Sequence, residues 1–295
     1  MIKKEHPQII SCKLRILSVD ISLNILYYLN IFIDWRNLMN ILAIGDVVST
    51  CGCDFLRKNL PALKRLHKID VCIVNGENSA QGNGILPQSA NHILDSGADV
   101  ITTGNHALRR FEIYEKFDSD TFPLIRPANF YRTAPGKGYY IIDKGAVQIA
   151  VINLQGVVYM DNNENPFDCI DRILEEVKHC KIKILDFHAE ATAEKRAMGF
   201  YLDGKISAMF GTHTHVPTAD AQILPNGTGY ITDLGMTGAI HSVLGIKPEL
   251  AIEKTRTNLP VKFENTEGAC KMEGCIFEID NKTGKTLSVQ QIIIT

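Results

Sequence analysis

The sequence predicts an α/β fold in which helices cover a layered sheet, and three observations lead to this expectation. From residue 40 onward, short runs of β-branched residues end in Gly or Asn and are followed by polar loops and segments with helical periodicity. Hydrophobic residues make up 45% and charged residues 22% of the 295 positions, which is the balance of an ordinary folded protein. The chain closes with two alternating segments that a turn separates.

Seven short runs of β-branched and other apolar residues have the composition of strands. They are Ile41–Ile44, Val71–Val74, Val100–Thr102, Ile149–Ile152, Ile182–Phe187, Ala208–Phe210 and Tyr230–Thr232. The tail from Cys275 alternates between apolar and polar residues on both sides of an Asn-Lys-Thr-Gly turn, and this pattern predicts an antiparallel hairpin that closes the domain.

Five segments between these strands have the spacing of apolar residues that is typical of helices. They are Asp54–Leu66, Pro87–Ser96, Arg110–Phe117, Pro166–Lys178 and Ala193–Gly199. In the fourth segment, the apolar residues fall on one helix face and predict a stripe that packs on a core (Phe167, Ile170, Ile173, Leu174 and Val177). The sequence shows no internal repeat and no linker, so we predict one domain from 39 to 295.

The charge balance and the cysteines narrow the class of protein. With 31 Lys and Arg against 33 Asp and Glu, the formal net charge is −2, so the chain lacks the basic excess of a broad nucleic-acid-binding protein. Eight cysteines are spread over the chain without a CxxC pair. This spacing is not that of a disulfide scaffold, and we expect reduced thiols in a cytoplasmic enzyme.

The first 38 residues differ in composition from the rest. They are rich in Ile and Leu, but charged and amide side chains interrupt them, so no stretch reaches the roughly 18–20 apolar residues of a membrane span. They also lack the clean apolar core and cleavage site of a signal peptide. Because Met39 directly precedes the first predicted strand, we expect 1–38 to be a dispensable extension or a misassigned start. An interfacial or partner-binding helix is the alternative.

Polar side chains follow five of the predicted strands, at the strand ends where ligands bind in open α/β sheets. These groups are Gly45-Asp46, Asn75-Gly76-Glu77-Asn78, Gly104-Asn105-His106, Asp186-Phe187-His188-Ala189-Glu190 and Gly211-Thr212-His213-Thr214-His215. Together they supply enough oxygen and nitrogen donors for two metal ions: Asp46, Glu77, Asn78, Asn105, His188, His213 and His215.

Each group taken alone has an ordinary explanation. In an extended segment His213 and His215 point to the same side and can face one ion, but two histidines on a solvated loop are the commoner case. Asp46 could cap the helix that follows, and Glu77 with Asn78 could be turn residues. Five such groups at the ends of five predicted strands are not explained in this way, so we predict a metal site at this edge.

Neighbouring thiols and carboxylates have other interpretations. Cys51 and Cys53 lie close to Asp46 in the sequence, but metals that handle phosphate prefer oxygen and nitrogen donors, so we interpret both as small loop residues. The acceptors that fix the histidine tautomers are expected among Asp186, Glu190, Asp220 and Asp233.

The order of these motifs resembles that of the calcineurin-like metallophosphoesterase superfamily, and more narrowly its bacterial YmdB-like branch. In that branch Gly-Glu-Asn replaces Gly-Asp-x-x-Asp, and the first motif lacks its usual histidine, whose position is Val48 here. The strings NGENSAQGNGI, RPANF, APGKG, AVINLQG, DFHAEATAEK, GTHTHVPTAD and YITDLGMTG carry the resemblance over nearly the whole domain. The branch also starts where Met39 stands, which agrees with the interpretation of residues 1–38.

The resemblance implies a four-layer α/β/β/α metallophosphoesterase fold for 39–295 and a site for two metal ions, usually iron or manganese. One ion would be held by Asp46, Glu77, Asn78 and His215, and the other by Glu77, Asn105, His188 and His213. Glu77 would bridge the two ions, and His106 would stay unligated as the proton donor.

Two segments depart from the pattern of the branch. Residues 49–54 are Ser-Thr-Cys-Gly-Cys-Asp, where the branch tends to have a loop that ends in Gly-Arg, so Cys53 replaces that arginine. The segment 107–110 is Ala-Leu-Arg-Arg, where a Trp-Asp pair is common. All candidate metal ligands are retained, so these changes bear on the shape of the pocket and on substrate preference.

This set of residues suits the hydrolysis of phosphodiesters. Two divalent ions about 3.5–4 Å apart can share a bridging hydroxide, which attacks in line, and can stabilise both sides of the displacement. Asp46, Glu77 and that hydroxide leave the site with a charge of about +1 (+4 − 3), which suits a singly charged diester. The resemblance points to cyclic nucleotides, 2′,3′-cyclic first and 3′,5′-cyclic second. RNA ends are a further class, although no basic track for a long strand is present.

Two alternatives use the same residues differently. A metal amidohydrolase also has a His-x-His motif, but that motif normally opens the chain, whereas four other motifs precede it here. A metal-binding regulatory protein with little turnover would not need an unligated His106. For partners we expect a small cyclic nucleotide and no membrane, and a homo-oligomer is compatible with the sequence.

Overall fold

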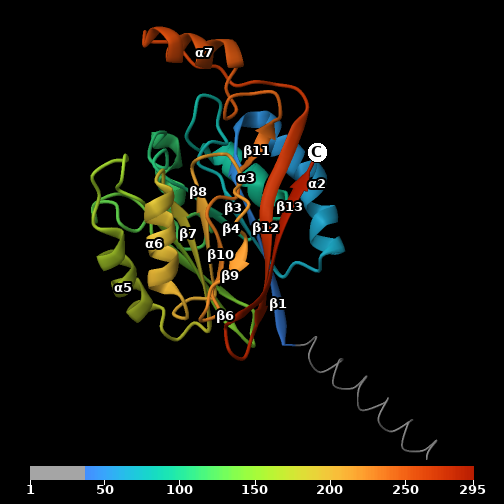
Figure 1. Ribbon diagram of the computed structural model, residues 1–295, viewed down its shortest axis with the longest axis vertical. Helices are drawn as coiled ribbons and strands as arrows, with labels where there is room; N and C mark the ends of the chain where they lie inside the picture. The colour runs from blue at the N-terminus through green and yellow to red at the C-terminus, as the bar shows by residue number, and fades with distance from the viewer. Residues whose placement is uncertain (1–36) are drawn as a thin grey trace, which may run out of the picture. The chain divides into compact units, whose positions relative to one another are not determined.

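Two β-sheets pack face to face in the computed structural model, which describes residues 37–295 (Figure 1). In the first sheet, β2 (Asp46–Val47), β11 (Met236–Ala239), β12 (Cys270–Asp280), β1 (Leu38–Ile44), β3 (Val71–Asn75) and β4 (Val100–Thr102) lie side by side in this order, and β13 (Thr286–Ile294) pairs with β12. The order in the second sheet is β5 (Tyr139–Asp143), β6 (Gln148–Gln155), β7 (Ile182–His188), β8 (Ala208–Thr212), β10 (Gly229–Ile231) and β9 (Gln222–Ile223).

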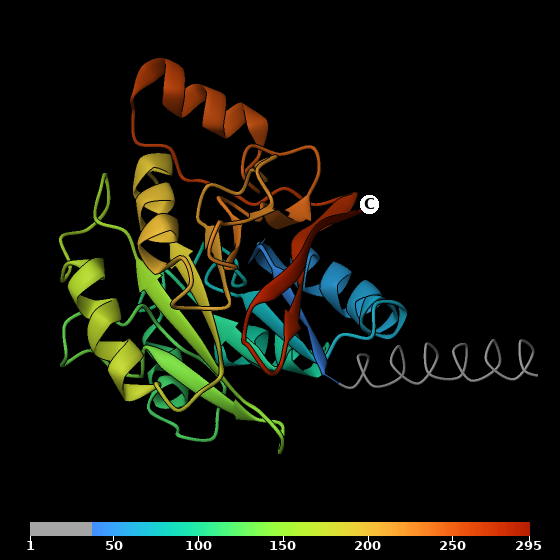
Figure 2. The ribbon, with the colours of Figure 1, turned by 60° about the horizontal axis from the view of Figure 1, so that its bottom comes forward.

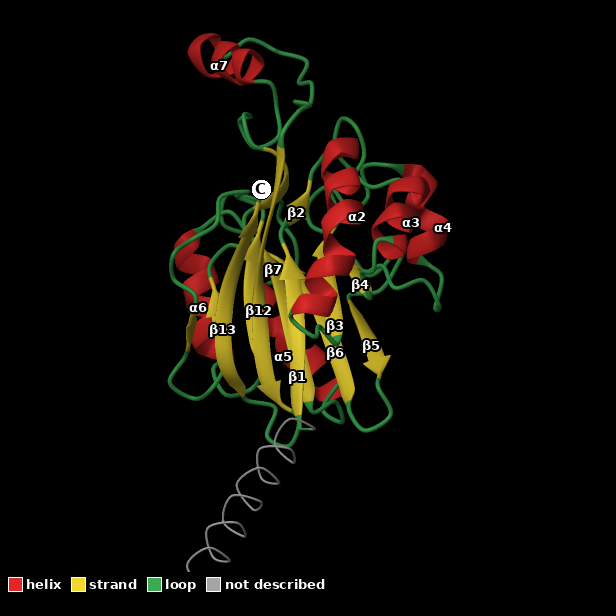
Figure 3. Cartoon of the chain, turned by 90° about the vertical axis from the view of Figure 1, so that its right-hand side faces the viewer, coloured by secondary structure: helices red, strands yellow, loops and turns green. Residues whose placement is uncertain are grey.

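Helices cover the outer face of each sheet (Figure 3). The first sheet is covered by α2 (Ser49–Leu66), α3 (Pro87–Asp95) and α4 (Tyr114–Phe117), which a 3-10 helix over Phe111–Ile113 precedes. The second sheet is covered by α5 (Pro166–Glu176) and α6 (Thr192–Leu202). The layers therefore follow the order helix, sheet, sheet, helix, and the predicted four-layer α/β/β/α fold is confirmed.

The strand β1 shows why the buried strands are apolar without interruption. Leu42 and Ile44 pack into the cluster under α2 and α3, whereas Ile41 and Ala43 pack into the cluster between the two sheets. Successive side chains of a strand point to opposite faces, so a strand covered on both sides needs apolar residues at every position. A third cluster lies between the second sheet and the helices α5 and α6.

Parallel pairing directs the functional loops to one edge. β1, β3 and β4 are parallel neighbours in the first sheet, and β6, β7, β8 and β10 are parallel neighbours in the second. The carboxyl ends of parallel strands lie at the same edge of a sheet, so the loops that follow them gather there. The predicted closing hairpin is also confirmed, as β12 and β13, but β12 begins at Cys270 rather than Cys275.

All seven predicted strands and all five predicted helical segments are present, but α2 begins at Ser49 rather than Asp54. Cys51 and Cys53 therefore lie in the first turns of a helix, and their interpretation as loop residues is wrong. The helix begins early because its first turns pack on β11. A Cβ atom at Gly52 would lie 2.4 Å from the carbonyl oxygen of Thr237, so only glycine allows this contact.

The helix α7 (Pro248–Thr257) was not expected from the periodicity. None of its residues is buried, so its sequence carries no apolar stripe, and Figure 2 shows it beyond the end of the two sheets. Its ends do carry recognisable signals, namely Pro248 at the first position and Asn258 in a left-handed conformation at the end. The short strands β2, β9 and β11 and the edge strand β5 were missed as well.

The interpretation of residues 1–38 falls outside the described residues, except for its last two positions, and stays a prediction. Within residues 37–295, no helix has the length and apolar character needed to cross a membrane. The seven cysteines of this part are all unpaired, in agreement with the expected reduced thiols.

Candidate metal centre

The predicted ligand side chains meet at the carboxyl edge of the two sheets. The seven residues belong to five strands or to the loops behind them: Asp46 lies on β2, Glu77 and Asn78 follow β3, Asn105 follows β4, His188 ends β7, and His213 and His215 follow β8. Every one of the seven has an atom within 3.6 Å of another member of the set. The structure thus brings together residues that are up to 169 positions apart in the sequence (215 − 46).

Glu77 and His188, both fully buried, are the middle of the first cluster. The His188 Nε2 atom lies 3.3 Å from Glu77 Oε1, 2.9 Å from Asn105 Oδ1 and 3.1 Å from His213 Nδ1. Among the His, Cys, Asp and Glu residues of the described chain, one group of at least three residues has ligand atoms that all lie within 4.8 Å of one another, and it consists of Glu77, His188 and His213. No thiol belongs to this group.

A hydrogen-bonded chain fixes the orientation of His188. The Thr212 hydroxyl donates to Asp186 Oδ1 at 2.7 Å and therefore accepts from the Nδ1–H of His188 at 2.9 Å. Burial raises the pKa of Asp186 to about 6, so its carboxylate is ionised near neutral pH and accepts this bond. The His188 Nε2 atom is then the one directed at the cluster, in the manner of histidines that bind metals.

The surroundings of His188 Nε2 require a positive charge. A carboxylate oxygen, an amide oxygen and a ring nitrogen, all electron-rich, surround this atom within 3.3 Å. Either a second proton on His188 or a metal ion at this point satisfies them. Burial lowers the pKa of His188, but the charge and hydrogen bond of Glu77, together with the charges of Asp46 and Asp186, outweigh burial and raise this pKa to about 9. A metal ion that binds here would displace this proton, so the donor set fits a metal.

Asp46, Asn78 and His215 form the second cluster. The Asp46 side chain is fully buried, and its Oδ1 atom has no hydrogen-bond partner among the described residues. The His215 Nε2 atom lies 3.6 Å from this oxygen and 3.3 Å from Asn78 Nδ2. A buried carboxylate oxygen without a partner is costly, and a cation at this point would remove the cost. Asn78 Nδ2 also donates to Glu77 Oε1 at 3.2 Å, which connects the two clusters.

The two histidines of the His-Thr-His motif do not face one point, although an extended segment would direct both to the same side. His213 joins the cluster of Glu77, whereas His215 joins that of Asp46. The cause is the backbone: φ is 99° at His213 and 61° at His215, and both values are outside the extended region. Such conformations are costly for residues other than glycine and tend to occur at functional sites.

Lys195, which was not among the predicted site residues, supports this strained loop. Its buried ammonium group donates to Asp233 Oδ2 at 2.7 Å and to the carbonyl oxygen of Thr212 at 2.9 Å. Asp233 Oδ2 also accepts from the backbone N–H of Thr214 at 3.2 Å. A lysine on the buried face of α6 is the signal that could have identified this residue, because a buried ammonium needs a partner.

The four carboxylates proposed as histidine acceptors have different roles. Asp186 acts through Thr212, and Glu190 Oε2 lies 3.1 Å from His213 Nε2. Asp220 instead accepts from Thr218 and Thr232, and Asp233 supports the loop through Lys195. The expectation is therefore met by two of the four residues.

Replacing Thr212 with valine is expected to weaken metal binding by about 10- to 100-fold, because the change removes the acceptor that orients His188. Metal affinity, measured by titration against a competing chelator, tests this. The matched control is Thr237→Val, the same exchange at a buried threonine whose hydroxyl has no partner in the described part of the chain. Equal affinities in the two variants would contradict the role of Thr212.

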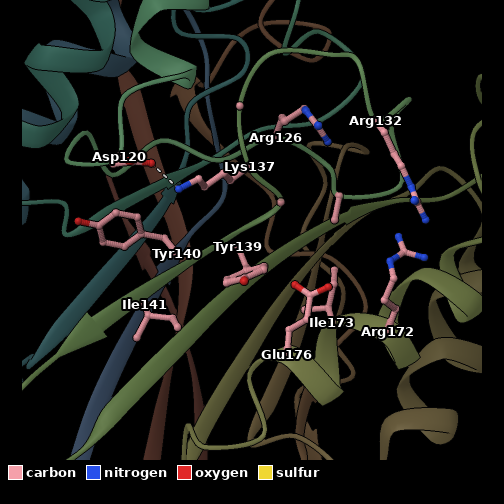
Figure 4. A pocket seen from close by; sticks show the side chains of 13 residues that line it. Asp120, Arg126, Arg132, Lys137, Tyr139, Tyr140, Ile141, Arg172, Ile173 and Glu176 are labelled. Atoms are coloured by element: carbon pink, nitrogen blue, oxygen red, sulfur yellow. Dashed lines mark hydrogen bonds and ion pairs between the residues drawn. The ribbon is translucent and has the colours of Figure 1, made fainter.

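A separate cavity of about 560 Å³ lies beside α5 and β5 (Figure 4). Three of the four cations that line it have partners: Arg126 donates to three backbone carbonyls, Lys137 pairs with Asp120, and Arg172 pairs with Glu164. None of the predicted site residues lines this cavity. The metal centre at the strand ends therefore stays the candidate functional site.

Comparison with known proteins places the chain in a family. The model of the YmdB-like protein family matches residues 42–292. The chain belongs to the YmdB-like family. A relative from Bacillus subtilis (strain 168), named 2′,3′-cyclic-nucleotide 2′-phosphodiesterase, is 44% identical over 257 residues, which cover 87% of this chain and 97% of the relative.

Two solved structures share the fold of this YmdB-like chain. The crystal structure of a hypothetical protein from Thermus thermophilus has a TM-score of 0.83 at 36% identity and covers 87% of this chain and 99% of its own. The crystal structure of a protein from Mycoplasma pneumoniae, described as a novel phosphatase, also has a TM-score of 0.83, at 32% identity, and covers 88% and 94%. The fold and the family expected from the motifs are confirmed.

Proposed function

We propose that this YmdB-like chain hydrolyses cyclic nucleotides at a centre of two divalent metal ions, with 2′,3′-cyclic nucleotides as the first choice. The observation that carries the proposal is the pair of buried donor clusters that Asn78 and Glu77 connect. In one cluster Asp46 Oδ1 has no hydrogen-bond partner among the described residues, and in the other His188 Nε2 lies within 3.3 Å of a carboxylate oxygen, an amide oxygen and a ring nitrogen. The activity named for the Bacillus subtilis relative supports the same substrate class.

The chain offers separate residues for the two ions. Asp46, Asn78 and His215 would hold one, Asn105, His188 and His213 would hold the other, and Glu77 would serve both. The donors are oxygen and nitrogen, which suit iron or manganese. When bound, such ions supply charge to stabilise the phosphoryl oxygens and lower the pKa of the attacking water.

The protein contributes few negative charges of its own to this centre. Asp46 and Glu77 are the two carboxylates in the set, because the other ligands are neutral amides and imidazoles. Burial raises the pKa of Glu77, but the charges and hydrogen bonds of His188 and His106 together outweigh burial and hold this pKa well below its usual range, so the carboxylate is ionised. The centre thereby keeps the excess of positive charge that an anionic diester needs.

His106 is suited to protonate the departing oxygen. Its Nδ1 atom donates to Asn78 Oδ1 at 2.8 Å and lies 3.1 Å from Glu77 Oε1, while its backbone N–H donates to Glu77 Oε2 at 2.9 Å. These contacts fix the ring and leave Nε2 for the substrate. The side chain is 20% exposed, so a bound diester has access to it.

The test is turnover of 2′,3′-cyclic AMP, 3′,5′-cyclic AMP and a phosphomonoester in manganese, in iron and in chelator. We expect metal-dependent opening of the 2′,3′-cyclic diester to 3′-AMP, because a 2′-phosphodiesterase breaks the ester bond at the 2′ oxygen. Stoichiometric metal binding without turnover of any diester would overturn the proposal and favour the metal-binding regulatory protein. Activity on 3′,5′-cyclic nucleotides or RNA ends, a homo-oligomer and a cytoplasmic location stay predictions.

A further inference from the structure

Tyr159 lies in the loop that connects β6 to α5, and its side chain is 89% exposed. A single exposed ring is ordinary on a protein surface. The backbone that carries this ring is not ordinary, because φ at Tyr159 is 63°, a left-handed conformation that is unfavourable for a bulky residue. The backbone at Tyr159 is therefore strained although its side chain is not buried.

A buried carboxylate holds this loop in place. Glu194, on α6, is 8% exposed and accepts from the backbone N–H of Val157 at 2.9 Å and from that of Val158 at 3.3 Å. A Cβ atom at Gly156 would lie 2.4 Å from Glu194 Oε2 and 2.6 Å from the Cβ atom of Ala189, which cannot swing away, so the close packing at this point favours glycine. The segment just before Tyr159 is therefore fixed, and the ring is presented from a rigid support.

The loop adjoins the metal centre. The N–H of Gly156 donates to the carbonyl oxygen of His188 at 3.0 Å, and three residues of chain span at most about 11 Å. Figure 1 shows the loop beside the beginning of α6, at the same edge as the ends of β6 and β7. Val158, 41% exposed, precedes the ring, so the rim next to His188 is apolar and uncharged at these two positions.

We propose that Tyr159 is the specificity-determining residue that stacks on the nucleobase of the substrate while the phosphate occupies the metal centre. This inference rests on the proposed function. It assigns a binding partner to the nucleobase, which lies away from the reacting bond. A flat aromatic face tolerates every base, so the expected substrates are nucleoside cyclic phosphates with little preference among bases. The stacked ring lowers KM and leaves the chemical step unchanged, because it does not touch the reacting atoms.

The experiment compares 2′,3′-cyclic AMP with ethylene phosphate, a five-membered cyclic diester that has no base. For Tyr159→Ala we expect kcat/KM on 2′,3′-cyclic AMP to fall by about tenfold, mostly through KM, and kcat/KM on ethylene phosphate to stay unchanged. Tyr159→Phe keeps the aromatic face and is expected to retain most of the wild-type value. The matched control is Phe200→Ala, at an exposed aromatic residue near the carboxyl end of α6. We expect this variant to have the wild-type kcat/KM on both substrates.

Three outcomes overturn the inference. One is an equal loss on both diesters in Tyr159→Ala, which would indicate a structural role. Another is wild-type kinetics in that variant, and the third is that Phe263→Ala, at an exposed ring that precedes β12, carries the tenfold loss instead. Failure of the proposed function is distinguishable from these, because the wild-type protein would then turn over neither substrate in the presence of metal.

Discussion

Replacing Glu77 with glutamine is expected to lower the turnover of 2′,3′-cyclic AMP by at least about 100-fold and to remove bound metal. Glu77 is fully buried and reaches His106 and His188 through its two oxygens, and it is the residue expected to serve both ions. Glutamine keeps the size of the side chain but replaces one oxygen by a group that donates, and it removes the negative charge.

Metal content by inductively coupled plasma mass spectrometry, measured together with turnover, tests this expectation. The control is Glu273→Gln, the same exchange at a buried carboxylate that contacts Lys271 and the backbone N–H of Met236 rather than imidazoles. We expect this control to bind metal as the wild type does. A Glu77→Gln protein with full metal content and full turnover would show that the carboxylate has no role in the centre.

His106→Ala is expected to reduce turnover by about 100- to 10,000-fold while the metal content stays at the wild-type level. The reason is that His106 is expected to donate a proton without binding metal. Its ring is held by Asn78 Oδ1 and Glu77 Oε1, so the loss of the ring leaves the metal ligands in place. Lost turnover with retained metal would distinguish the role of His106 from that of Glu77, whose replacement is expected to remove the metal as well.

A substrate with a better leaving group provides a further check on His106. A nitrophenolate departs without protonation, so the defect of His106→Ala on bis-p-nitrophenyl phosphate is expected to be much smaller than on 2′,3′-cyclic AMP. His179→Ala, at an exposed histidine after α5, is the control for removal of an imidazole. Equal defects on both diesters, or loss of metal from His106→Ala, would contradict the assignment as proton donor.

The strands and the meeting of the polar groups were predictable from sequence because both follow from local patterns. A strand buried on both faces is apolar at every position, as in β1, and parallel strands bring their following loops to one edge. The order of five polar groups along the chain therefore indicated a common site. The grouping of His213 and His215 into separate clusters came from the family resemblance and not from the periodicity.

Other features depend on tertiary contacts that no local pattern carries. The early start of α2 depends on Gly52 against the carbonyl of Thr237, 185 residues later (237 − 52). The positive φ of His213 depends on a loop that Lys195 supports from α6. The helix α7 has no buried face, so its apolar residues have no period to detect. The periodicity of apolar residues indicates which faces are buried. It does not predict a helix that has no buried face, nor a helix boundary that depends on a distant backbone atom.

We propose that this YmdB-like chain opens cyclic nucleotides with metal ions bound at the strand ends. The most direct measurement counts metal ions per chain and follows turnover of 2′,3′-cyclic AMP in the same samples, as isolated, after chelation and after addition of manganese. We predict about two ions per chain, loss of turnover with the metal, and recovery of both together. Turnover that persists in the metal-free protein, or two bound ions without any turnover, would contradict the claim.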